Sequence, residues 1–253
     1  LILVAQETTM YGTDLYGKKT LHLLMKELCK IKGIRWIRVL YCYPEEIYDE
    51  LIQVMKEEKK ICHYLDLPIQ HASDRILKRM GRRTTRAQLT ATIEKLRKEI
   101  PDIVLRTTLI TGFPGETEED HQELMEFVDE MEFDRLGAFT YSPEEGTPAE
   151  TMEDQIPEEI KEERRDEIME LQQEISLEKG NDRIGQELLV MIEGKVSGES
   201  AYIARTYGDA PKVDGYIFVQ TGELLMTGDF AKVRVTGALE YDLIGELADE
   251  YTE

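Results

Sequence analysis

The segment with the clearest chemical potential is a glycine-containing loop between an apolar run and an acidic run. Residues 104–120 read VLRTTLITGFPGETEED. Gly112 and Gly115 favour a tight turn in which the backbone can approach a ligand closely. Thr117 and Asp120 have the spacing of a capping box, which predicts that a helix begins directly after the loop. A strand, a glycine loop and a helix N-terminus together present backbone N–H groups to a polar ligand, although ordinary strand–helix turns share this pattern.

The rest of the chain supplies the elements that must position this loop. Apolar runs of strand character alternate with segments whose apolar residues recur at helical spacing. This alternation predicts a parallel sheet covered by helices, and five such units are too few for a closed eight-stranded barrel. The predicted strands are 1–5, 36–43, 63–70, one that begins at 104, and 136–141, and the predicted helices are 19–32, 45–59, 73–80, 86–99, 117–131 and 156–179. The last helix is very acidic, and we expect it to be a solvated face that leads into the second domain.

Ligands of parallel α/β sheets bind at the carboxyl ends of the strands, so the residues that follow each predicted strand define a candidate site. These residues are Gln6 and Glu7, 43–44, Gln70 and His71, 112–116, and 141–142. For Gln6 and Glu7, a polar strand end without function remains an equal alternative. His71 is more often a structural histidine than a catalytic one.

The pattern changes after residue 185, where five short β-rich runs are separated by glycines. They cover 188–192, 201–204, 216–219, 231–235 and 243–246. This pattern predicts a small antiparallel barrel of the oligonucleotide-binding type. We therefore divide the chain into domains 1–182 and 183–253. Acidic residues outnumber basic ones by thirteen to five from residue 186 on, so this barrel does not gain affinity by neutralising phosphates.

The net charge of −21 bounds the partners of the protein. It disfavours nucleic acid and favours a basic protein, although solubility or a heat-adapted surface would also explain it. No apolar run is long enough for a membrane span. The widely spaced Cys29, Cys42 and Cys62 fit no metal or cluster motif, and their odd number argues against a disulfide framework. We expect them to be buried thiols of a cytoplasmic protein.

Four sequence segments occurring together in one order resemble a known family. They are LPIQHASDRILKRMGR (67–82), TTLITGFPGETEED (107–120), FTYSPEEGTPA (139–149) and YGDAPKVDG (207–215). The set resembles the radical-SAM methylthiotransferases. The last segment resembles the TRAM domain of the RimO branch, which modifies a ribosomal protein.

The resemblance implies a fold and an activity. The fold is a partial TIM-like radical-SAM barrel followed by an OB-like TRAM domain. One 4Fe–4S cluster on a three-cysteine loop binds S-adenosylmethionine, which is cleaved with the help of an electron donor to a 5′-deoxyadenosyl radical. A second cluster in an N-terminal domain takes part in sulfur donation. The RimO branch methylthiolates the β-carbon of an aspartate on ribosomal protein S-twelve of the small subunit.

This chain departs from the family in one respect, because it has no CxxxCxxC motif and begins in mid-strand without a methionine. We expect a fragment that lacks the cluster-binding parts, binds no cluster of its own and is inactive alone.

The resemblance also implies site residues. Gln6 and Glu7 would lie near the methionine part of the cofactor, and Gln70 and Ser73 would bond its polar groups. The loop from 112 to 116 would approach the adenine side. One residue of the basic cluster at 75–83 would pair with the cofactor carboxylate. The predicted cofactor-binding residues are Gln6, Glu7, Gln70, Ser73, Arg75, Gly112, Phe113, Gly115 and Glu116, and the predicted surface for the ribosomal protein contains Asp209 and Asp214.

Three alternatives stay open. The tRNA branch of the same family methylthiolates an adenosine, but its small barrel would be expected to be basic. A non-catalytic module that docks a basic protein would explain the absent cluster motif, but not the polar strand ends. A plain aldolase-type barrel would need a Schiff-base lysine at a strand end, and the sequence places none there.

Overall fold

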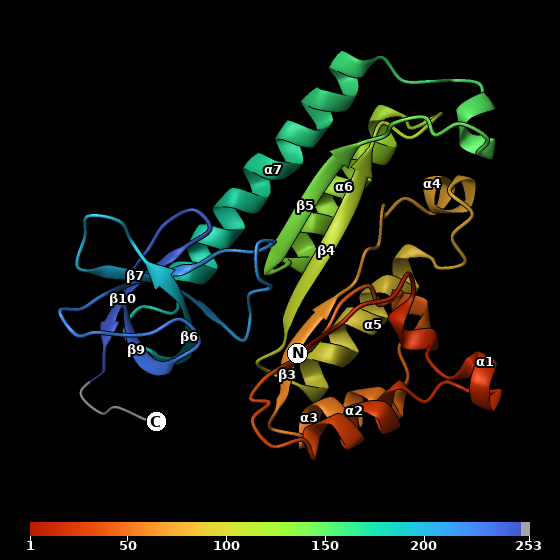
Figure 1. Ribbon diagram of the computed structural model, residues 1–253. Helices are drawn as coiled ribbons and strands as arrows, with labels where there is room; N and C mark the ends of the chain where they lie inside the picture. The colour runs from red at the N-terminus through yellow and green to blue at the C-terminus, as the bar shows by residue number, and fades with distance from the viewer. Residues whose placement is uncertain (249–253) are drawn as a thin grey trace. The chain divides into compact units, whose positions relative to one another are not determined.

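The computed structural model describes residues 1–248, so the last five residues of the predicted second domain lie outside the described part. The chain divides into two compact units, Leu1–Gln172 and the remainder from Gln173 on. Each unit is built around its own sheet (Figure 1). Within residues 1–248, no helix combines the length and apolar composition that a membrane span requires.

The first unit contains the predicted parallel sheet. Its strand order is β1-β2-β3-β4-β5, and every neighbouring pair is parallel. The strands are β1 (Ile2–Leu3), β2 (Ile37–Val39), β3 (Ile61–Asp66), β4 (Val104–Thr111) and β5 (Arg135–Thr140). The helices are α1 (Thr13–Tyr16), α2 (Leu21–Cys29), α3 (Asp49–Glu57), α4 (Asp74–Arg79), α5 (Arg86–Glu99) and α6 (Glu118–Met131), with short 3-10 turns η1 (Thr8–Met10), η2 (Pro44–Glu46) and η3 (Pro148–Thr151). The long helix α7 (Glu158–Asn181) begins in this unit and continues past its last residue, Gln172.

The sequence pattern of β4 explains how the sheet has one buried face and one cavity face. Leu105, Thr107 and Leu109 are fully buried, whereas the alternating Arg106, Thr108 and Ile110 are partly exposed. Side chains of a strand alternate between its two faces, so the buried set packs under the helices. Burying each large apolar side chain of this kind contributes about 1.5–3 kcal/mol.

Both predicted capping boxes are present. Thr85 accepts the Gln88 amide and Gln88 returns a bond to the Thr85 backbone, and Thr117 and Asp120 are paired in the same way. These reciprocal bonds satisfy amides that the first helical turn leaves without partners. The strand at 104 and the helices at 86 and 117 therefore begin where the sequence predicts.

Other boundaries differ from the prediction. The segment predicted as strand 63–70 leaves regular pairing after Asp66 and returns only as a bridge between Gln70 and Leu109. Pro68 has no amide to donate to a ladder, and Gln70 adopts φ +70°. The helix predicted from 45 begins at Asp49, because 44–46 form η2 and Tyr48 is extended.

The second unit is a closed barrel of five strands in the order β10-β8-β7-β6-β9. The predicted small barrel is present, and its neighbouring strands pair antiparallel except β8 and β10, which run parallel. A ring with an odd number of strands cannot alternate direction throughout, so one parallel pair is unavoidable. The strands are β6 (Glu187–Lys195), β7 (Ala201–Thr206), β8 (Ile217–Gln220), β9 (Phe230–Ala238) and β10 (Leu243–Leu247).

Candidate cofactor-binding site

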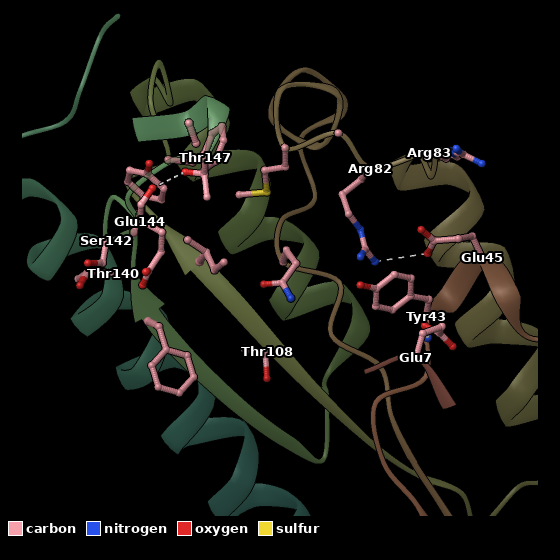
Figure 2. A pocket seen from close by; sticks show the side chains of 18 of the residues that line it. Glu7, Tyr43, Glu45, Arg82, Arg83, Thr108, Thr140, Ser142, Glu144 and Thr147 are labelled. Carbon is pink, nitrogen blue, oxygen red and sulfur yellow. Dashed lines mark hydrogen bonds and ion pairs between the residues drawn. The ribbon is translucent and has the colours of Figure 1, made fainter. Parts of the chain in front are cut away.

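A cavity of about 920 Å³ opens at the carboxyl ends of the strands of the first unit. Each strand is followed by one of its lining residues, which are Glu7, Tyr43, Gln70, Phe113 and Tyr141 in strand order. The side chains converge from segments far apart in the sequence (Figure 2). The location is the one that parallel α/β sheets use for ligands.

One side of the cavity presents a cation held on an aromatic ring. The Arg82 guanidinium lies 4.5 Å from the centre of the Tyr43 ring. Its Nη2 donates to the Pro68 carbonyl at 3.2 Å and lies 3.4 Å from a Glu45 carboxylate oxygen (Figure 2). Because the distance to the Glu45 carboxylate is long for an ion pair, Glu45 balances the Arg82 charge only in part. Arg82 can therefore still bind an anionic group.

The remaining lining combines aromatic rings with polar residues of the segment after β5. Phe113 and Tyr141 pack edge to face with ring centres 5.2 Å apart, and both line the cavity. Phe139 also lines it and is 58% exposed. Thr147 donates its hydroxyl to the Glu144 carbonyl at 2.8 Å, which orders the loop after β5 (Figure 2). A flat, partly apolar ligand such as a nucleobase suits these rings.

Glu7 has an unusual proton affinity for a carboxyl group. It accepts the amides of Thr9 at 2.9 Å and Tyr43 at 3.0 Å. Burial raises the pKa of Glu7 to about 7, against the lowering effect of those two amides, and the charges of Glu46 and Glu45 raise it further. Glu7 is therefore a cavity carboxyl that changes charge near neutral pH.

The loop after β4 does not offer its backbone amides to a ligand, contrary to the prediction. The amides of Gly112 and Phe113 donate to Glu116 Oε2 at 2.8 and 3.2 Å. Glu116 is buried, and Arg164 of α7 donates to its other carboxylate oxygen at 2.9 Å. The glutamate of the loop thus fills the nest that its own glycine turn creates, and Gly112 takes φ +71° to close it.

Ser73 and Arg75 are turned toward helix α6 and away from the cavity lining. Ser73 Oγ donates to Asp120 at 2.6 Å, and Arg75 forms an ion pair with the same carboxylate and donates to the Gly115 carbonyl at 2.7 Å. Burial opposes ionisation of Asp120, but the bonds from Arg75, Ser73 and Thr117 outweigh it and lower the pKa of the carboxyl. These residues anchor the helix start under the loop.

The nine predicted cofactor-binding residues therefore separate into three groups. Glu7, Gln70 and Phe113 line the cavity. Gln6 is exposed and is not part of the lining. The other five hold the loop and the helix start, and they are Ser73, Arg75, Gly112, Gly115 and Glu116.

Sequence reasoning missed several lining residues and the helix behind them. Thr108, Phe139 and Thr140 line the cavity, and the period-two alternation of β4 could have indicated Thr108. Lys161 and Arg164 of α7 are buried, although the segment was expected to be solvated. Their sequence context is a run of charges, which carries no sign of burial.

Some buried polar atoms of the cavity lining have no hydrogen-bond partner among the described residues, and they indicate which ligand groups the cavity can bind. Three cavity residues have one such atom, namely Gln70 Oε1, Arg82 Nε and Tyr141 Oη. A buried polar atom without a partner is costly, so acceptor and donor groups of a ligand would relieve them. The described residues contain no group of three or more His, Cys, Asp or Glu side chains that could hold a metal ion. The residues that line the cavity thus suit a polar organic ligand.

The second unit corrects the predicted protein-docking residues in part. Asp209 is buried and accepts the Thr206 hydroxyl at 2.6 Å and the Thr206 amide at 3.2 Å. Asp214 accepts the Ala210 amide at 2.8 Å and is half-buried. Asp209 therefore orders the loop after β7 and presents no carboxylate to a partner.

The parallel sheet with a cavity at its strand ends and the small closed barrel each match a known family model. Residues 2–128 match the model of the Radical SAM superfamily, and residues 184–248 match that of the TRAM domain. The chain belongs to the Radical SAM superfamily. It is also a homologue of the proteins named ribosomal protein uS12 methylthiotransferase RimO.

The relative from Lachnoclostridium phytofermentans is 64% identical over 245 residues, which cover 97% of this chain and 56% of the relative. The relative from Clostridium perfringens is 55% identical over 250 residues, which cover 99% of this chain and 56% of the relative. The chain thus spans little more than half the length of these relatives.

Among solved structures, the radical-SAM enzyme coproporphyrinogen III oxidase (HemN) from Escherichia coli aligns with a TM-score of 0.50 at 19% identity. The alignment covers 61% of this chain and 36% of that enzyme, and it supports the fold alone.

Proposed function

We propose that this chain works as the cofactor-binding and TRAM portion of a ribosomal protein uS12 methylthiotransferase. The observation that carries the proposal is the 64% identity to such a protein, which extends over 97% of the chain and through both units. The activity is methylthiolation of the β-carbon of an aspartate. S-adenosylmethionine on a 4Fe–4S cluster supplies the one-electron chemistry in such a protein.

The cavity residues take roles that follow from their chemistry. Arg82 pairs with the carboxylate of S-adenosylmethionine, and Glu7 accepts hydrogen bonds from its amino group. Phe113 and Tyr141 pack against the adenine, and Gln70 Oε1 accepts a hydrogen bond from the ligand. The charged cofactor ends and the charged side chains compensate each other in a partly buried site.

The cluster ligands belong, in this proposal, to the part of the relatives that this chain does not span. Buried Cys42 and Cys62 and half-buried Cys29 form no disulfide and no metal-ligand set within residues 1–248. We therefore expect the chain alone to hold neither of the two clusters and to lack activity. The complete protein would receive electrons from a separate donor.

The proposed partner is a basic ribosomal protein. The net charge of −21 favours a cationic partner over nucleic acid, and a ribosomal substrate places the activity in the cytoplasm. In the TRAM unit, the half-buried Asp214 stays a candidate contact residue for this partner, whereas the buried Asp209 does not.

The test uses the full-length gene product, expressed anaerobically in a bacterium that lacks its own uS12 methylthiotransferase. Mass spectrometry of uS12 should show the mass gain of one methylthio group. Arg82→Met should abolish that gain, while Lys78→Met, on the exposed face of α4 and outside the cavity lining, should leave it intact. Modification of tRNA in place of uS12 would favour the tRNA branch. A protein that binds uS12 but carries neither iron nor activity would favour the docking module.

A further inference from the structure

The structure assigns a role to two buried cations of helix α7. We propose that Lys161 and Arg164 are positioning residues that hold Phe113 and Tyr141, the aromatic wall of the cavity, in the geometry that binds S-adenosylmethionine. This inference rests on the proposed function for the identity of the ligand. The clamp formed by Lys161 and Arg164 is a property of the chain itself and is tested separately below.

Lys161 holds the end of strand β5. Its Nζ donates to the Tyr141 carbonyl at 2.8 Å and pairs with Glu158 at 3.0 Å. The same ammonium lies 5.5 Å from the centre of the Tyr141 ring. Its stem packs on Gly112, where a Cβ atom would come within 2.2 Å of Lys161 Cγ. The Lys161 side chain therefore contacts the residue that directly follows β4 and the residue that directly follows β5.

Arg164 holds the loop after β4 through Glu116. Nη1 donates to Glu116 Oε1 at 2.9 Å and to the Glu116 carbonyl at 3.3 Å. The other carboxylate oxygen accepts the amides of Gly112 and Phe113. A continuous chain of bonds thus leads from Arg164 to the backbone of Phe113. The Arg164 charge is further balanced by Glu118 at 3.3 Å.

A third contact joins the helix backbone to the sheet. Thr111, the last residue of β4, donates its hydroxyl to the Lys161 carbonyl at 3.0 Å. Three independent contacts therefore fix α7 to the strand ends that carry Phe113 and Tyr141. The exposed Glu162 and Glu163 between the two cations face solvent, so one stripe of the helix faces the strand ends.

A purely structural role would be served more simply by apolar residues. Burying two cations carries a desolvation penalty that well-packed aliphatic side chains avoid. Both cations reach backbone or loop groups directly behind the aromatic wall, and neither fills a void in the apolar core. The two cations therefore pack less favourably than aliphatic side chains would, but they fix the positions of the Phe113 and Tyr141 rings. A ligand-binding wall requires such fixed positions.

The test measures binding of S-adenosylmethionine to the full-length protein with reconstituted clusters, by anaerobic calorimetry without reductant. Lys161→Met keeps the stem on Gly112 and removes the donor to Tyr141. We expect the Kd to rise about 10-fold, the effect of losing one charge-assisted hydrogen bond. Arg165→Met is the matched control, because Arg165 lies on the same helix, is half-exposed and, within residues 1–248, forms its ion pair with the neighbouring Asp166. Its Kd should stay unchanged.

Hydrogen exchange tests the clamp without any ligand. Lys161→Met should speed exchange over residues 138–143, and Arg164→Met should speed it over residues 108–118. The Arg165→Met variant should exchange like the wild type in both segments. If Lys161→Met fails to fold, Thr111→Val removes one of the three contacts without touching a charge, and its Kd should rise in the same direction.

The outcomes separate the two ideas. A lower melting temperature with an unchanged Kd, or unchanged exchange at the wall, would overturn the positioning role. A wild-type protein that binds no S-adenosylmethionine would instead contradict the proposed function, while the exchange experiment would still decide whether the clamp exists.

Discussion

Replacement of Glu116 by glutamine tests the arrangement under the loop most directly. The wild-type carboxylate is fully buried and accepts from two backbone amides and from Arg164. A glutamine has one oxygen and one amide nitrogen at these positions. Either the backbone amides or the Arg164 guanidinium then faces another donor. The perturbation thus removes a charge and creates a donor–donor contact without changing the side-chain volume.

The magnitude follows from the burial of both partners. Breaking a buried pair by neutralising one member costs roughly 3–5 kcal/mol. Arg164 keeps its bonds to Glu118 and the Glu116 carbonyl, so we expect the lower part of this range, about 3 kcal/mol. For a unit of this size, that loss should lower the melting temperature by roughly 6–12 °C.

The assay is urea unfolding followed by tryptophan fluorescence. Trp36 is the single tryptophan of the chain and lies in the first unit, so its signal reports that unit. The control is Glu118→Gln, which removes the exposed partner of the same arginine and should cost less than about 1 kcal/mol. If Glu116→Gln loses less than about 1 kcal/mol, or no more than the control, the loop is not held by this buried pair.

Three further changes test other contacts of the two units. Because the pKa of Glu7 is raised from 4.5 to about 7, its contribution to stability is present below pH 4.5 and is lost as the pH rises to 7; Glu7→Gln should remove this slope from urea midpoints measured across that range. Asp120→Asn should cost roughly 2–3 kcal/mol, since Arg75 is half-exposed, and the gap to wild type in the same assay should persist down to about pH 3.8 and narrow below it, because the lowered pKa keeps the carboxylate ionised only in the folded state. Gly245→Ala would place a Cβ atom 2.4 Å from Val233 Cγ1 and 2.8 Å from the Arg234 carbonyl, and calorimetry should show a lower melting temperature for the barrel and an unchanged one for the first unit.

The elements that sequence patterns identify well are those whose information is local. The strand at 104 alternates buried and half-buried residues, and the helices at 86 and 117 begin with complete capping boxes, so their residue types alone define them. The strand predicted at 63–70 was too long, because Pro68 interrupts pairing where the apolar pattern continues. The cavity position also followed from topology, since parallel strands bring their carboxyl ends to one edge.

The roles of individual polar residues were harder to predict, because they depend on which partner the fold brings near. The glycine loop was expected to offer free amides, but a glutamate four residues along occupies them. Glu116 can be buried because Arg164, forty-eight residues later in helix α7, donates to its carboxylate and balances its charge. In sequence, Arg164 sits in a run of charges that is typical of a solvated helix. Local patterns describe the loop and the helix correctly, yet neither pattern contains the contact between them.

This contact changes where specificity for a ligand can arise. With the Gly112 and Phe113 amides satisfied by Glu116, the polar groups left for a ligand come from other segments. They are Gln70 and Tyr141 at strand ends and Arg82 after helix α4. The loop contributes a ring, Phe113, whose position depends on the buried pair behind it. A substitution at Arg164 would therefore act on the cavity without touching its lining. A change in ligand affinity caused by a substitution at Arg164 should accordingly appear together with faster amide exchange at Gly112 and Phe113, and not without it.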